Sequence, residues 1–111
     1  MSDMKFSEGI HLFNQEEFYE CHEVLESLWL KDHSSDRLFY QGLIQVASGF
    51  FHVQKGRTKP ALQVLRSGLE KLSPYPQSHH GINLGKLIME VENWLTTPTK
   101  QLPKIEHARI F

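Results

Sequence analysis

The chain has 111 residues, enough for one compact domain with a hydrophobic core and too few for a second independent one. Its 12 Lys and Arg residues nearly balance 13 Asp and Glu residues, so the formal net charge of -1 provides no long-range field for nucleic acid or an acidic membrane. No stretch approaches the roughly 20 apolar residues of a membrane-spanning helix, and the N-terminus has no signal-type apolar segment. We therefore expect a soluble, cytoplasmic protein that binds neither nucleic acid nor membrane.

Residues from about 5 to 13 are predicted to form a short first helix with one buried stripe, because apolar residues recur there at helical spacing. Asn14 is placed to cap a second helix, with Glu17 three residues later as in a capping box. Phe13 and Phe18 are spaced as a hydrophobic staple around this start. The second helix should run to about Leu30, and Ser34 or Ser35 should cap the next one.

The third helix, predicted from about Asp36 to Lys55, has apolar residues around most of its circumference. Such a helix belongs at the centre of a bundle. Its polar residues occupy one strip of roughly 60°, formed by Gln41, Gln45, Ser48 and His52. Gly42 and Gly49 flank this strip, and each costs about 1 kcal/mol in a helix interior. Their presence indicates either close approach of another backbone or access to the strip.

The rest of the chain adds two predicted helices and a tail. Thr58 should cap a fourth helix, and Asn83 should cap a fifth that ends near Thr96. The prolines and the glycine of residues 73–81 predict a loop between them. Residues 98–111 are expected to form an extended tail packed on the surface. Because no β-strand candidate appears, the predicted fold is all-α, a single small helical bundle of four to five mostly antiparallel helices spanning residues 1–111.

The candidate functional residues lie where the second helix is expected to face the third. At about 100° per residue, His22 falls inside the apolar arc of the second helix, and Glu26 follows one turn later at the edge of that arc. If the two helices pack side by side, these side chains meet Gln41, Gln45 and His52 of the third helix. The sequence therefore predicts a buried polar site, in which these residues satisfy one another's hydrogen bonds.

Two stretches carry a family resemblance. They are Phe13-Asn14 followed by Phe18-Tyr19-Glu20-Cys21-His22-Glu23-Val24-Leu25-Glu26 and Trp29, and Tyr40-Gln41-Gly42-Leu43-Ile44-Gln45 with His52 and Gly56. Together they resemble the small helical proteins catalogued as domain of unknown function family 309, over roughly residues 13–94. The resemblance implies an all-helical cytoplasmic protein of a prokaryote or a plastid-related lineage, in which these polar residues matter. It implies no particular activity.

Three interpretations of the site stay open. In the first, a small polar ligand binds or acid–base chemistry occurs, with His22, Glu26 and His52 as catalytic candidates and Gln41 and Gln45 as substrate-binding candidates. In the second, these two histidines and Glu26 hold a divalent metal. The metal is not favoured, because neither the Glu-x-x-His pair of di-iron bundles nor a His-Glu-x-x-His run is present where needed. In the third, the cluster is structural, and the protein is an interaction module or a homodimer.

Other chemically active residues are expected to have no role in the site. Cys21 points elsewhere on its helix and is expected to be a buried structural thiol. Trp29 and Trp94 lie on apolar stripes and are predicted core residues. His79 and His80 lie in the predicted loop without partners at metal-ligand spacing, so we expect them to be exposed.

Overall fold

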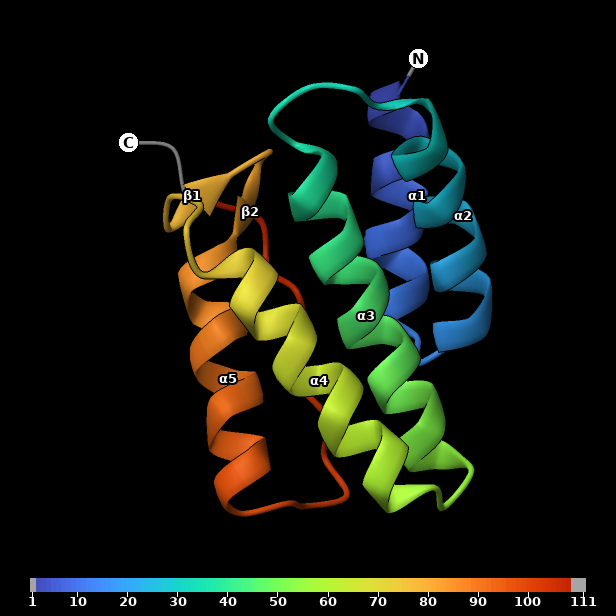
Figure 1. The fold of residues 1–111 in the computed structure, drawn as a ribbon, viewed down its shortest axis with the longest axis vertical. Helices are drawn as coiled ribbons and strands as arrows, with labels where there is room; N and C mark the ends of the chain where they lie inside the picture. The colour runs from blue at the N-terminus through green and yellow to red at the C-terminus, as the bar shows by residue number, and fades with distance from the viewer. Residues whose placement is uncertain (1, 109–111) are drawn as a thin grey trace.

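In a computed structural model, which describes residues 2–108 and only the backbone of residues 2 and 3, five helices each pack against the next along the chain. They are α1 (Ser2–Asn14), α2 (Phe18–Lys31), α3 (Arg37–Gln54), α4 (Thr58–Leu72) and α5 (Leu84–Thr96). Figure 1 shows α1 and α2 on one side of α3, with α4 and α5 on the other. The predicted helical bundle is confirmed. Within residues 2–108, no helix combines the length and apolar character that a membrane span requires.

Helix α3 lies at the centre of the core, as its nearly uniform apolar surface predicts. The ring of Phe50 is fully buried and contacts three other aromatic rings. Its centroid lies 5.7 Å from that of Phe18 in α2, 6.3 Å from that of Phe13 in α1, and 5.3 Å from that of Trp94 in α5. Burying one such ring contributes about 1.5–3 kcal/mol, so this aromatic cluster holds three other helices, α1, α2 and α5, against α3.

The two glycines of α3 serve its packing against α4. A Cβ atom at Gly42 would lie 2.7 Å from Leu72, and one at Gly49 would lie 2.5 Å from Leu65. From the α4 side, a Cβ at Gly68 would lie 2.9 Å from the carbonyl oxygen of Gly42. Any side chain at these positions would push the helices apart. Of the two explanations expected for these glycines, close helix approach is therefore the correct one.

The predicted cap of the second helix is wrong. Asn14 ends α1 instead, and α2 begins after Glu17, which makes no side-chain capping bond. The amide of Asn14 donates to the carbonyl of Ile105 at 2.8 Å and accepts from its N–H at 2.7 Å. This pairing with the distant tail satisfies the side chain in place of a local cap. The predicted ring contact between Phe13 and Phe18 does form, with centroids 5.1 Å apart.

The remaining predicted caps have mixed outcomes. Asn83 accepts from the N–H of Lys86 and caps α5 as expected. Helix α3 begins after Asp36 rather than after a serine, and α4 begins at Thr58 with Arg57 in the cap position, in both cases without a side-chain capping bond. A helix end that packs well against its neighbours does not need a local cap. A sequence pattern cannot reveal that packing.

The expectation of no strand is also wrong, although the strands are short. Strand β1 (Ser78–His79) pairs antiparallel with β2 (Ile82–Asn83) through a two-residue turn. His80 and Gly81 form that turn with φ angles of 53° and 79°, and a positive φ at both positions is what a type I′ turn requires. The extended tail then returns to this hairpin, where the N–H of Asn83 donates to Glu106 and that of Ala108 donates to Gly81. The end of the predicted tail, including Ile110 and Phe111, lies outside the described residues.

Candidate functional site

A pocket of about 160 Å³ lies between the first half of α2 and the second half of α3. Both helices supply its lining, which consists of Phe18, Tyr19, His22, Ser48, Phe51 and His52. Residues three or four positions apart share a face of a helix, so Tyr19 stands beside His22 and Ser48 beside His52. The structure therefore brings two of the predicted site residues, His22 and His52, to one pocket.

His22 and Glu26 lie one turn apart on α2, as their spacing predicts. The Nε2 atom of His22 is 3.7 Å from an Oε2 atom of Glu26, and the two side chains are 29% and 44% exposed. This distance is beyond hydrogen-bond range, so Glu26 does not fix the tautomer of the imidazole. It attracts the protonated imidazole, by about 0.3–0.5 kcal/mol for an exposed pair on a helix.

One nitrogen of each pocket imidazole lacks a partner in the described part of the chain. The Nδ1 atoms of His22 and His52 are covered by protein and form no hydrogen bond there, and the same holds for Trp29 Nε1 and Gln45 Oε1. All four atoms belong to α2 or α3. Leaving a buried polar atom unpaired costs about 1–3 kcal/mol, and most such atoms in proteins are paired. These two helices thus carry hydrogen-bonding capacity that the described fold does not use.

The two glutamines share the polar strip of α3 but do not line the pocket. Gln41 and Gln45 are half-buried, like Ser48 and His52. The Cβ of Gln45 lies 3.2 Å from the place that a Cβ at Gly68 would occupy, so this residue leans toward α4. The expected meeting of all five candidate residues is therefore only partly present. The histidines share the pocket, and the glutamines lie along α3 toward its N-terminus.

The expectation of a buried site needs correction, because no polar or charged residue among residues 4–108 is buried. The strip on α3 lies between two flanking helices that do not close over it. On one flank, Tyr19 of α2 packs against Phe51, with ring centroids 5.7 Å apart. On the other flank, α4 packs at Gly42 and Gly49. The site is consequently a half-open pocket at the surface of the bundle.

The metal interpretation gains no support from the arrangement. In the part of the chain that the structure describes, no three His, Cys, Asp or Glu side chains come together as a group that could hold a metal ion. The expected metal-binding set of His22, Glu26 and His52 therefore forms no such group. Glu26 lies beside His22 but does not line the pocket that contains both histidines.

Cys21 and Trp29, both expected to stand outside the site, differ in their surroundings. Cys21 is fully buried, and this burial raises the pKa of its thiol to about 12. A thiol that stays protonated is not a nucleophile, which agrees with a structural role. Trp29 is half-buried rather than a full core residue. The guanidinium of Arg37 lies over its ring, 4.3 Å from the centroid, and donates to its backbone carbonyl at 2.7 Å.

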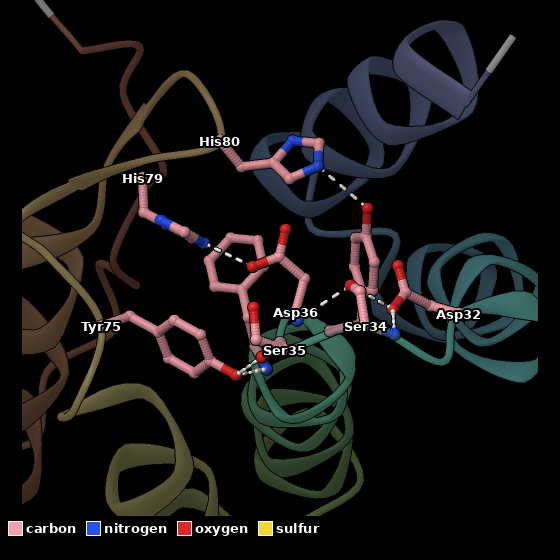
Figure 2. Close-up of polar contacts among 9 residues, drawn as sticks. Asp32, Ser34, Ser35, Asp36, Tyr75, His79 and His80 are labelled. Carbon is pink, nitrogen blue, oxygen red and sulfur yellow. Dashed lines mark hydrogen bonds and ion pairs between the residues drawn. The ribbon is translucent and has the colours of Figure 1, made fainter.

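A second pair of histidines forms a polar cluster at the N-terminal end of α3, which Figure 2 shows. His79 Nε2 lies 2.7 Å from Asp36 Oδ1, and His80 Nε2 lies 2.9 Å from the hydroxyl of Tyr40. Both histidines are half-buried. The prediction that they are exposed is therefore wrong. In the same cluster the Tyr75 hydroxyl donates to Ser35 and accepts from the Phe39 N–H.

Sequence reasoning missed several of the residues that shape both regions. Tyr19 and Ser48 line the pocket, and the signal that could have found them was their place one turn from His22 and His52. Phe51 also lines the pocket, and sequence reasoning did not single it out. His79 and Asp36 are 43 positions apart, and no local pattern signals a pair at that separation.

Two comparisons with known proteins match this chain. A family model described as "Domain of unknown function (DUF309)" matches residues 6–64, which include every residue that lines the pocket. An "Uncharacterized protein" of Aquifex aeolicus (strain VF5) is 30% identical over 91 residues, which are 81% of this chain and 27% of that protein. The chain thus spans about a quarter of the length of that relative. Neither description names an activity.

Proposed function

Because the chain belongs to the DUF309 family, whose description gives no function, we propose from the geometry that this domain binds a small polar molecule in the pocket between α2 and α3. One observation carries the proposal. The two imidazoles of the pocket each keep an Nδ1 atom that has no partner in the described fold. Protein covers these atoms, so a ligand would regain part of the free energy that they cost if a half-turn of the rings brought Nδ1 to the pocket.

Each candidate residue has a defined part in this proposal. His22 and His52 contact the ligand, and Glu26 lies beside His22, with its Oε2 atom 3.7 Å from Nε2. A half-turn of an imidazole about its Cβ–Cγ bond exchanges Nδ1 with Cδ2, so each ring has two orientations to offer a ligand. Gln41 and Gln45 would position a ligand long enough to continue along α3. If the ligand is a substrate, the imidazoles act as acid and base, because an imidazole can both accept and donate a proton.

The structural alternative, an interaction module or homodimer, rests on a different observation. Leu30 near the end of α2 and Leu38 near the start of α3 are 60% and 52% exposed. Under that alternative, the polar residues matter for stability and respond to no small molecule. The same experiment separates the two functions.

A thermal-shift screen of metabolites and divalent ions tests the proposal, with wild type beside His52→Leu. A ligand at a hundredfold excess over Kd stabilises the wild type by about 2.7 kcal/mol, a shift of roughly 10 °C for a domain of this size. His52→Leu should lose that response while keeping or slightly raising the melting temperature, because it removes an unpaired buried nitrogen.

His11→Leu is the matched control, since His11 is exposed near the end of α1. This variant should keep the full response of the wild type. The proposal is wrong if no compound in a broad screen shifts the wild type, or if His52→Leu and His22→Leu both respond as the wild type does. A lower melting temperature in both variants, without any ligand response in the wild type, would support the structural alternative.

A further inference from the structure

The size of the pocket limits what it can hold. Its volume is about 160 Å³. A cavity of roughly 150 Å³ in a protein core holds one benzene molecule, whereas sites for drug-sized ligands start at roughly 300 Å³. The pocket therefore has room for a single six-membered ring, and a bicyclic ring system would extend beyond it.

The walls of the pocket favour a flat molecule. Three of its six lining residues are Phe18, Tyr19 and Phe51, and the two histidines add flat rings. The ring of Tyr19 lies at 26° to that of His22 and at 46° to that of Phe51, with centroids 6.3 Å and 5.7 Å away. Aromatic contacts contribute about 0.5–1.5 kcal/mol beyond the burial of area, and a planar ring gains more of them than a puckered one.

The polar groups that line the pocket are two imidazoles and one hydroxyl. A neutral imidazole has one N–H and one nitrogen lone pair, and the hydroxyl of Ser48 both donates and accepts. The lining includes no Lys or Arg, and Glu26 lies near His22. Lys55 packs over the Phe51 ring, 5.4 Å from its centroid, without lining the pocket. A phosphate or carboxylate would therefore find no fixed positive charge among the lining residues.

From these features, and resting on the proposed function, we infer that the ligand is a neutral single-ring nitrogen heterocycle with an N–H donor and a carbonyl acceptor on one edge. One flat face of the ring packs against the aromatic wall to which Tyr19 and Phe51 contribute. Its polar edge hydrogen-bonds with the imidazoles of His22 and His52. Free pyrimidine bases belong to this chemical class, and nucleotides do not, because they are larger and carry phosphate.

Four matched probes test each part of this inference. Uracil is a flat lactam ring, dihydrouracil has the same polar groups on a puckered ring, hypoxanthine carries a lactam on a bicyclic system, and uridine 5′-monophosphate adds a sugar and a charge. Each is titrated into the isotope-labelled full chain while the Cε1–H signals of His22 and His52 are recorded by NMR. Uracil should shift both signals with a Kd at least tenfold below those of the other three probes. His22→Leu and His52→Leu should each weaken uracil binding at least tenfold, and His11→Leu should leave it unchanged.

The outcomes separate this inference from the function on which it rests. Equal binding of dihydrouracil would overturn the requirement for a flat ring, and tighter binding of hypoxanthine or of the nucleotide would overturn the size or charge limit. If uracil moves neither signal while another screened compound moves both, the pocket binds a different ligand class and only this inference fails. If no compound of any class moves either signal, the inference and the proposed function fail together.

Discussion

The two pairs of histidines in this domain differ in how the fold uses them. His79 and His80, on the hairpin, each place a ring nitrogen within 3 Å of a partner on α3 or just before it, namely Asp36 and Tyr40. His22 and His52, on α2 and α3, each have a buried nitrogen without any partner in the described chain. The first pair therefore joins two parts of the fold, and the second pair keeps hydrogen-bonding capacity for something else.

This contrast shows what a histidine contributes in each setting. The hairpin histidines exchange a solvated state for hydrogen bonds and ring contacts within the protein, so they should contribute to stability. The pocket histidines lose solvent at one nitrogen and gain no bond in return, so they should contribute little or cost free energy. Residues that cost stability in this way are often kept for function.

His79→Ala should have the largest effect on stability. It removes the 2.7 Å bond to Asp36 and the contacts of the ring with Phe39 and Tyr75, whose centroids lie 4.8 Å and 5.1 Å away. A bond to a charged partner contributes about 1.5–3 kcal/mol, and we expect a loss of about 2 kcal/mol because both side chains are partly solvated. The melting temperature should fall by roughly 8 °C. Urea unfolding followed by circular dichroism measures the loss.

The matched substitution in the pocket pair, His22 and His52, is His52→Ala. It should change the stability by no more than about 0.5 kcal/mol. A double-mutant cycle of His79→Ala with Asp36→Ala isolates the coupling between the partners, which should exceed about 1 kcal/mol. Should His52→Ala destabilise the protein as much as His79→Ala does, the contrast between the two pairs would not hold.

Substitutions of His80 should lower the stability less than His79→Ala does, by an amount that depends on the replacing residue. His80→Ala loses the bond to Tyr40 and the packing on Phe6, whose ring centroid is 4.5 Å away, and it leaves alanine at a φ of 53°. His80→Asn loses the same contacts but suits the turn, because Asn-Gly is the preferred pair for type I′. We expect losses of about 1.5 kcal/mol for alanine and about 0.5 kcal/mol for asparagine, since the left-handed conformation costs alanine about 1 kcal/mol.

The same urea experiment measures both variants of His80. An equal loss in the two would mean that the turn conformation contributes nothing and that the ring contacts contribute everything. A larger loss for asparagine than for alanine would contradict the assignment of the turn. Either result would change the relative contributions assigned to the turn conformation and to the ring contacts of His80.

The fold was largely predictable because helical periodicity is strong in every segment that became a helix. The central place of α3 followed from its apolar surface alone, and Asn83 was found as a cap because its partner is three residues away. Two of the failures share one physical cause. Asn14 pairs with Ile105, and Asp36 with His79, so each obtains its partner from a distant part of the chain. Local patterns contain no information on such pairs.

The site was predictable only to the level of helix faces. The periodicity placed His22 on the side of α2 that meets α3, and the spacing of His52 placed it on the polar strip of α3. The periodicity could not show that Gln45 lies against α4 at Gly68 and outside the lining of the pocket. It also could not show how far α2 and α4 leave the strip uncovered, which decides that the site is half-open rather than buried.

The smallest expected effect concerns the loop that presents Asp36 to His79. Asp32 accepts from the N–H and the hydroxyl of Ser34 at 2.7 Å and 2.6 Å, and these bonds lower the pKa of its carboxyl, with smaller contributions from the charges of His33 and Arg37. Because the folded pKa lies below the unfolded one, the bonds stabilise the protein above the ordinary Asp pKa. That contribution is lost as the pH falls through the lowered folded value.

Asp32→Asn removes this acid dependence, so the wild type should lose more stability than the variant between about pH 5 and pH 2. Urea unfolding at a series of pH values measures the difference, which should be small because Asp32 lies at the surface and water screens it. Ser34 Oγ accepts from the Asp36 N–H at 3.1 Å, which links this loop to the hairpin pair. The effect of Asp32→Asn should therefore shrink in the His79→Ala background, where Asp36 no longer has its partner. Full additivity would show that the loop and the hairpin pair stabilise the fold independently.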